Sequence, residues 1–153
     1  MSNLRDIEWP KSRRYKSGTE WEPAGFFSDG LLEASRFDLM LGFFSSTAIN
    51  VLADGFAAFI ANGGCMRMII NDILSIEDWN AFQVAEDNST LIPYFDLSDI
   101  QKLKNVLSKR GKHFFECLSW MIRYNRIEIK IVVPQSGVGI AHTKCGLFSD
   151  GTN

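Results

Sequence analysis

The chain has 153 residues, of which 46% are hydrophobic and 22% are charged, and its formal net charge is −2. This length suits one domain with a hydrophobic core and is too short for two ordinary domains. The small negative charge gives no overall attraction to nucleic acid or to an anionic membrane, so a phosphate-binding surface would have to be local.

The cysteines and the N-terminal segment exclude further classes of protein. Cys65, Cys117 and Cys145 are far apart and, with only two histidines in the chain, form no zinc motif. We expect three buried free thiols and no metal site. Residues 1–24 lack the apolar core of a secretory signal, and no apolar run approaches the roughly 20 residues of a membrane span. The sequence therefore predicts a cytoplasmic protein without membrane contact.

The chain begins with a polar leader, and a βαβ unit is expected after it. Residues 1–24 contain a basic cluster and read as a solvated leader whose tryptophans, Trp9 and Trp21, pack on the body or on a partner. The pattern then predicts a helix over 28–36, a buried strand over 37–44, a helix over 45–64 and a strand over 65–72. A strand, a helix and a strand with short links form a right-handed unit with parallel strands.

The rest of the chain predicts helices followed by two strands. Helical spacing appears over 97–109 and 113–124, with a shorter helix near Asp78, and strands are expected over 127–134 and 140–148. Asp72 and Asp78 read as turn or helix-cap residues. The expected fold class is α/β, with a mixed β-sheet sandwiched by helices.

The last predicted strand, IAHTKCGLF, carries two cations in an apolar setting. On a strand, His142 and Lys144 share one face. One interpretation is a satisfied histidine beside a lysine that extends its amine into solvent. Another is catalysis without a metal ion, because a neutral imidazole can attack phosphorus while an ammonium binds the phosphate oxygens. His113 lies at the start of a basic helix, and we give it no role.

The segment HTKCGLFSD, His142 to Asp150, resembles the HxK motif of the phospholipase D superfamily. Residues 37–72 are similar to the opening strand, helix and strand of bacterial phospholipase D-like domains, which occur in helicases and in restriction or defence proteins. The resemblance covers residues 26–153. It implies that His142 forms a phosphohistidine and that Lys144 binds the scissile phosphate. The family's acidic residue corresponds to Asp150, which stands one place later than the pattern, after Ser149.

The resemblance also implies how the site is completed. The family continues into a strand with a Gly-Ser-x-Asn element, which is not found before Asn153. We therefore expect residues 25–153 to form a phospholipase D-like domain that is incomplete at its C-terminus. Because the family builds one active centre from two HxK motifs, a homodimer or a second phospholipase D-like half is the expected partner, with no cofactor and no metal ion.

Two functions remain open at this point. The first is a metal-independent phosphodiesterase of the nuclease type that acts on DNA within a larger DNA-processing protein. The second is a non-catalytic module for nucleic-acid binding or dimerisation in a helicase or restriction protein. A lipid-hydrolysing phospholipase is disfavoured, because the sequence predicts neither a signal peptide nor an amphipathic membrane helix.

Overall fold

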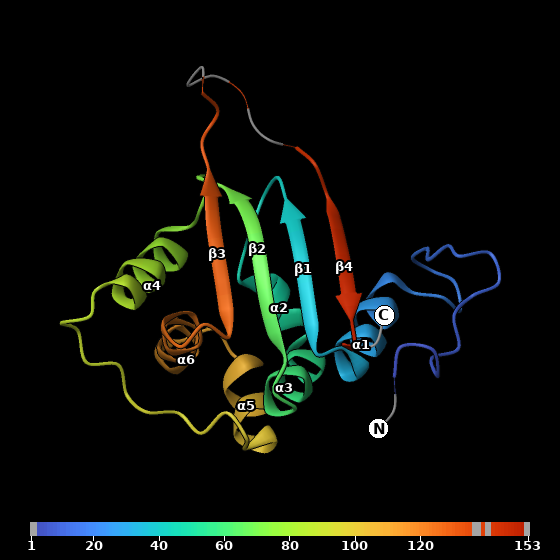
Figure 1. The fold of residues 1–153 in the computed structure, drawn as a ribbon, viewed down its shortest axis with the longest axis horizontal. Coiled ribbons are helices and arrows are strands. Elements are labelled where there is room, and N and C mark those ends of the chain that lie inside the picture. The colour runs from blue at the N-terminus through green and yellow to red at the C-terminus, as the bar shows by residue number, and fades with distance from the viewer. Residues whose placement is uncertain (1–2, 136–138, 140–141, 152–153) are drawn as a thin grey trace.

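The computed structural model describes residues 3–135, 139 and 142–151 (Figure 1). The elements of these residues, in chain order, are α1 (Pro23–Glu33), β1 (Arg36–Leu41), α2 (Thr47–Val51), α3 (Ala53–Ala61), β2 (Cys65–Asn71), α4 (Ile76–Glu86), α5 (Ile100–Leu107), α6 (Lys112–Arg123), β3 (Ile127–Val132) and β4 (Cys145–Ser149). No helix among these residues is long and apolar enough to cross a membrane.

The strands form one mixed sheet in the order β3-β2-β1-β4. Strand β1 is parallel to β2, and β2 is parallel to β3, whereas β4 runs antiparallel to β1. The α/β class, the mixed sheet and the opening βαβ unit are therefore confirmed. The unit forms because two short apolar strands flank an apolar helical stretch that ends at Gly63, which has a φ of 90° that favours glycine.

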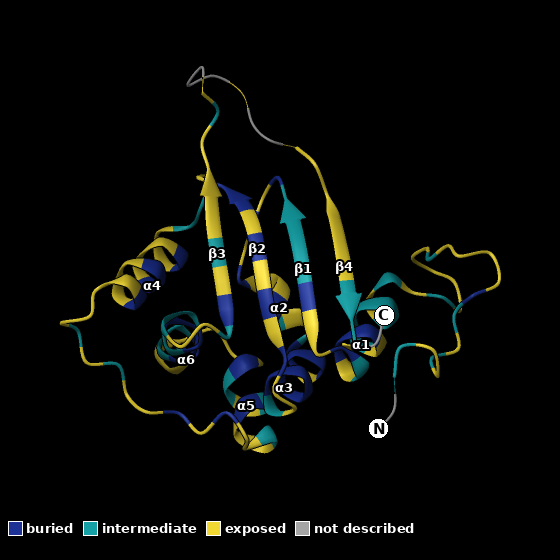
Figure 2. Cartoon of the chain, in the orientation of Figure 1, coloured by how far each residue is buried: buried dark blue, intermediate teal, exposed yellow. Residues whose placement is uncertain are grey.

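Helices cover only one face of this sheet, so the expectation of helices on both faces is wrong for the described residues (Figures 1 and 2). On β2, Met66, Met68 and Ile70 are buried beneath the helices, whereas Arg67 and Ile69 on the opposite face are exposed. Because strand side chains alternate between the two faces, Met66, Met68 and Ile70 make one face of β2 fully apolar, and Arg67 places a charge on the other face. We call the helix-free side the outer face.

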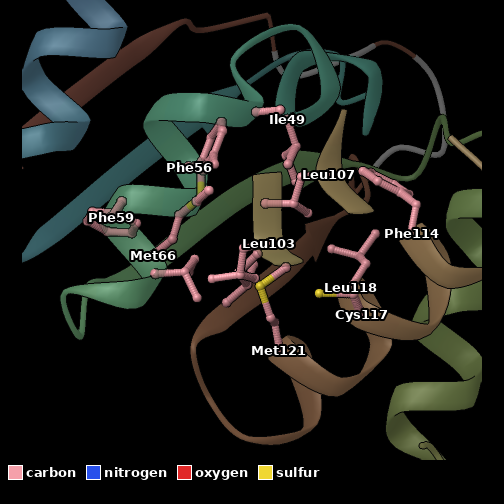
Figure 3. Close-up of a cluster of buried hydrophobic side chains, with 14 of the residues drawn as sticks. Ile49, Phe56, Phe59, Met66, Leu103, Leu107, Phe114, Cys117, Leu118 and Met121 are labelled. Atoms are coloured by element: carbon pink, nitrogen blue, oxygen red, sulfur yellow. The ribbon is translucent and has the colours of Figure 1, made fainter. Parts of the chain in front are cut away.

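The hydrophobic core lies between the inner face of the sheet and helices α3, α5 and α6 (Figure 3). Its largest fully buried side chains include Phe37, Phe59, Met66, Leu103, Leu107, Phe114 and Leu118. These residues follow helical spacing in α5 and α6 and alternation in the strands, the periodicities from which the helices and strands were predicted.

Several boundaries differ from the expectations. Helix α1 begins at Pro23, five residues before the expected Ser28, because proline fits the first turn of a helix. The expected helix over 45–64 is divided at Leu52 into α2 and α3. The N-terminal segment packs on the body through aromatic rings: Trp9 and Tyr15 contact Phe26, at centroid distances of 5.7 and 5.2 Å.

The expectation of three buried thiols is wrong for two of them. Cys117 is buried on the inner side of α6, but Cys65 and Cys145 are exposed. Both exposed cysteines occupy outward positions, on β2 and β4 respectively, because strand alternation places Met66 and Phe148 on the covered face instead.

Candidate functional site

His142 and Lys144 lie just before β4, not on the strand where the sequence pattern placed them. Both side chains are exposed. Ile140 and Ala141, the first residues of the expected strand, lie outside the described residues. The two side chains therefore do not share a strand face, and the position of His142 is set instead by its contacts.

The pairing of β4 with β1 supplies that position. The register runs from Arg36 opposite Ser149 to Met40 opposite Cys145. Continued three residues further, it places Phe43 opposite His142. The two rings are in contact there, with centroids 5.9 Å apart and an interplanar angle of 75°. The pairing itself ends at Cys145, but the two segments stay close enough beyond it for His142 to contact Phe43.

This contact lies at the carboxyl edge of the parallel strands. Because β4 runs antiparallel to β1, the segment before β4 adjoins the end of β1 (Figure 1). In open α/β sheets, ligands commonly bind in the crevice outside the carboxyl ends of the strands. His142, Lys144 and the half-exposed Phe43 therefore present an imidazole, an ammonium and an aromatic ring at an edge suited to binding.

Asp150 is not brought together with His142 and Lys144. It follows the other end of β4, where its Oδ2 accepts a hydrogen bond of 3.1 Å from the backbone N–H of Leu4. The five residues of β4 between these ends span about 17 Å at about 3.3 Å per residue. In this arrangement Asp150 anchors the N-terminal segment to the sheet and is too far away to contact the imidazole.

The loop that carries Phe43 is held by two buried polar side chains that the sequence interpretation missed. We call residues 42–46, between β1 and α2, the β1–α2 loop. Asn71 Nδ2 donates a hydrogen bond of 2.6 Å to the carbonyl of Gly42, and Asp78 Oδ2 accepts one of 3.3 Å from the N–H of Ser46. Asn71 is 1% exposed and Asp78 is 0% exposed.

Asp78 is therefore not the helix cap that the sequence pattern suggested. Ser75 caps α4, and its side chain accepts the hydrogen bond from the N–H of Asp78. The sequence contains an indication that Asp78 is buried. It lies three and four residues before Ala81 and Phe82, which are buried on the same helix face. The carboxyl faces Arg110, whose Nη2 lies 4.0 Å from Oδ1.

Two other features of the described residues bear on ligand binding. They contain no cluster of three or more His, Cys, Asp or Glu side chains that could hold a metal ion. A groove of about 370 Å³ lies on the outer face and is lined by polar and apolar side chains that include Asp38, Met40, Arg67, Ile69 and Lys130. The residues that line this groove include Cys145 but neither His142 nor Lys144.

Comparison with known proteins returned no relative. No family model matches the chain, and no curated protein or solved structure matches it. The resemblance to the phospholipase D superfamily therefore stays a prediction from the segment His142 to Asp150 and the βαβ pattern before it.

Proposed function

We propose that this chain carries one half of a metal-independent phosphodiesterase site of the phospholipase D type, which acts on DNA as part of a larger DNA-processing protein. The observation that carries the proposal is the placement of His142 against Phe43 at the carboxyl edge of β1, with the exposed Lys144 two residues away. A nucleophile and a phosphate-binding cation would both be accessible to a polymer at that edge.

The chemistry assigned to His142 is nucleophilic. A ring nitrogen of the neutral imidazole forms a bond to phosphorus while the bond from phosphorus to the leaving deoxyribose oxygen breaks, which gives a phosphohistidine. Water then attacks phosphorus, the phosphorus–nitrogen bond breaks, and the imidazole is regenerated. Lys144 stabilises the charge that builds up on the non-bridging oxygens.

The proposed site needs a second copy of the motif. The leaving oxygen requires a proton, and a histidine from a second copy of the chain or from another phospholipase D-like half would supply it. His113 does not serve this purpose within one chain, because it lies on the first turn of α6 and its Nδ1 is 3.0 Å from Glu116.

A second candidate function is a non-catalytic module for nucleic-acid binding or dimerisation. The position of Asp150 favours it, because the acidic residue of the motif is tied to Leu4 at the far end of β4. With Asp150 held at the other end of β4, the cations of this edge would bind a phosphate without turning it over.

The test is DNA cleavage in the presence of EDTA by the purified protein and by its His142→Ala and Lys144→Ala variants. His113→Ala is the matched control, since His113 is an exposed histidine outside the proposed site. We expect cleavage and an acid-labile phosphohistidine in the wild type and in His113→Ala, and neither in His142→Ala. Equal cleavage by all variants contradicts the proposal. DNA binding without cleavage, lost in Lys144→Ala, establishes the second function, and hydrolysis of phosphatidylcholine in place of DNA corrects the substrate.

A further inference from the structure

We propose that Asn71 and Asp78 are positioning residues of the candidate site, which hold the β1–α2 loop so that Phe43 fixes the ring plane of His142. Neither residue belongs to the motif from which the function was proposed. The expected effect on catalysis rests on the proposed function. The expected effect of the two residues on the orientation of the His142 ring does not.

Asn71 holds the start of the loop. The β1–β2 pairing ends with Leu41 opposite Ile70, and one residue further along each strand the Asn71 side chain donates to the Gly42 carbonyl. Buried side-chain amides are nearly always hydrogen-bonded. This bond therefore fixes the direction in which the chain leaves the sheet, one residue before Phe43.

Asp78 holds the end of the loop. Its Oδ2 accepts the hydrogen bond from Ser46, whereas Oδ1 has no hydrogen-bond partner in the described part of the chain. The guanidinium of Arg110 lies 4.0 Å from Oδ1, which is too far for a hydrogen bond. Burial of a carboxyl group is costly, and helix capping does not account for it because Ser75 is the cap. The hydrogen bond to Ser46, which attaches the β1–α2 loop to α4, explains why this carboxyl group is buried.

The two anchors flank the residue that contacts His142. Gly42 directly precedes Phe43, and Ser46 follows three residues later, so the backbone of Phe43 is tied to β2 on one side and to α4 on the other. Phe43 itself is 48% exposed and is not held by burial in the core. The orientation of its ring, and of the imidazole against it, therefore depends on the anchors.

Such an arrangement matters for an in-line attack. The imidazole nitrogen must point at phosphorus opposite the leaving oxygen, and a displacement of about 1 Å can reduce the rate by on the order of 100-fold. Release of either anchor should therefore lower kcat by roughly 10- to 100-fold with little change in KM, because Lys144 still binds the phosphate.

The experiment follows the ring resonances of His142 by NMR, which requires no catalytic activity. Phe43→Leu gives the reference positions without the ring current of Phe43, and His113 serves as an internal standard. We expect Asn71→Asp, which loses the donor, and Asp78→Ala, which loses the acceptor, to move the His142 resonances toward the reference. Asp78→Asn keeps an acceptor oxygen and should keep the wild-type positions.

The matched control is Ser119→Ala, which removes another buried hydrogen bond on α4, the 2.9 Å bond from Ser119 Oγ to the Ala81 carbonyl. If Asn71→Asp and Asp78→Ala move the His142 resonances no further than Ser119→Ala does, the inference is overturned. Asn71→Ser replaces Asn71→Asp if that variant does not fold. A shift in the anchor variants combined with undiminished cleavage by His142→Ala would support the positioning and refute the proposed function instead.

Discussion

The imidazole of His142 meets the ring of Phe43 edge to face, at the point where the extended register of β4 and β1 aligns the two residues. Edge-to-face contacts between aromatic rings stabilise by about 0.5–1.5 kcal/mol beyond the burial of area. An interaction of this size has little effect on the stability of the fold, but it is sufficient to select one orientation of an exposed side chain.

Replacement of Phe43 should affect activity more than stability. In Phe43→Ala we expect kcat for DNA cleavage to fall about tenfold, while the free energy of unfolding changes by less than about 1 kcal/mol because the ring is half-exposed. Tyr94→Ala is the control, since Tyr94 is another exposed aromatic residue and its ring packs against Trp120 instead. An unchanged kcat in Phe43→Ala would show that the Phe43 ring does not contribute to the site.

The glycines of α1 provide a test of packing. A Cβ on Gly30 would lie 2.5 Å from the ring of Phe148, which is itself stacked on Phe37 at a centroid distance of 4.2 Å. We expect Gly30→Ala to lower the free energy of unfolding by about 1–3 kcal/mol. Gly25→Ala, on the same helix, meets nothing within 4 Å and should stabilise by about 0.5–1 kcal/mol. Urea denaturation measures both, and equal effects would contradict this packing.

The three thiols should react with a thiol reagent at two different rates, according to their exposure. Cys65 and Cys145 are exposed and should be labelled rapidly by a thiol reagent in the folded protein. Cys117 is buried, and burial raises the pKa of its thiol to about 12, so its label should appear only on unfolding. Mass spectrometry of labelled peptides distinguishes the sites, and rapid labelling of Cys117 would show that α6 opens.

The raised pKa of Cys117 also predicts a dependence of stability on pH. Between the ordinary thiol pKa of 9.0 and about 12, the unfolded chain loses this proton and the folded chain keeps it. The contribution of Cys117 to stability is therefore complete below pH 9 and falls as pH rises, by up to about 1.4 kcal/mol per pH unit. Cys117→Ala lacks this term, so the wild type should lose stability faster between pH 9 and pH 11. Parallel curves for the two proteins would show that the thiol does not titrate in this way.

Arg123 should stabilise the C-terminal end of α4 and the turn that follows it. Its guanidinium donates hydrogen bonds to the carbonyls of Val84, Ala85, Asp87 and Thr90, at the end of α4 and in the turn that follows. In Arg123→Lys, a single ammonium cannot reach all four carbonyls, and we expect a loss of about 1–3 kcal/mol together with faster amide exchange over residues 84–90.

Arg126 offers the matched control for that prediction. It donates in the same way to the carbonyls of Ile60 and Gly64 at the end of α3. Arg126→Lys should therefore accelerate exchange over residues 60–64 and leave residues 84–90 unchanged. Hydrogen exchange by mass spectrometry reads both segments, and acceleration of the same segments in both variants would show global destabilisation instead.

Much of the fold followed from local patterns. The apolar strands, the glycines after α3 and the helical spacing of α5 and α6 were sufficient to predict the mixed sheet and the βαβ unit. These features depend on residues close together in the chain, and sequence periodicity reports them directly.

The site was harder to predict because it depends on where neighbouring elements end. In the sequence, apolar and polar residues alternate from His142 into β4 as they would in a longer strand, but the pairing of β4 with β1 extends only to Cys145, opposite Met40. The bond from Asn71 that redirects the chain at Gly42 joins residues 29 positions apart. The pairing of Asp38 with Arg67, which keeps the outer face charged, likewise exists only once the parallel register is formed.

That pairing has a consequence for how the protein behaves at high concentration. The carboxylate of Asp38 accepts hydrogen bonds from Arg36 and from Arg67, so two guanidinium groups share one anion beside Met40, Ile69 and Leu147. Stacking two such sheets face to face would strip water from these charges, which is costly unless new polar partners replace it. The shared carboxylate of Asp38 should therefore oppose face-to-face stacking of two outer faces, although Met40, Ile69 and Leu147 lie beside it.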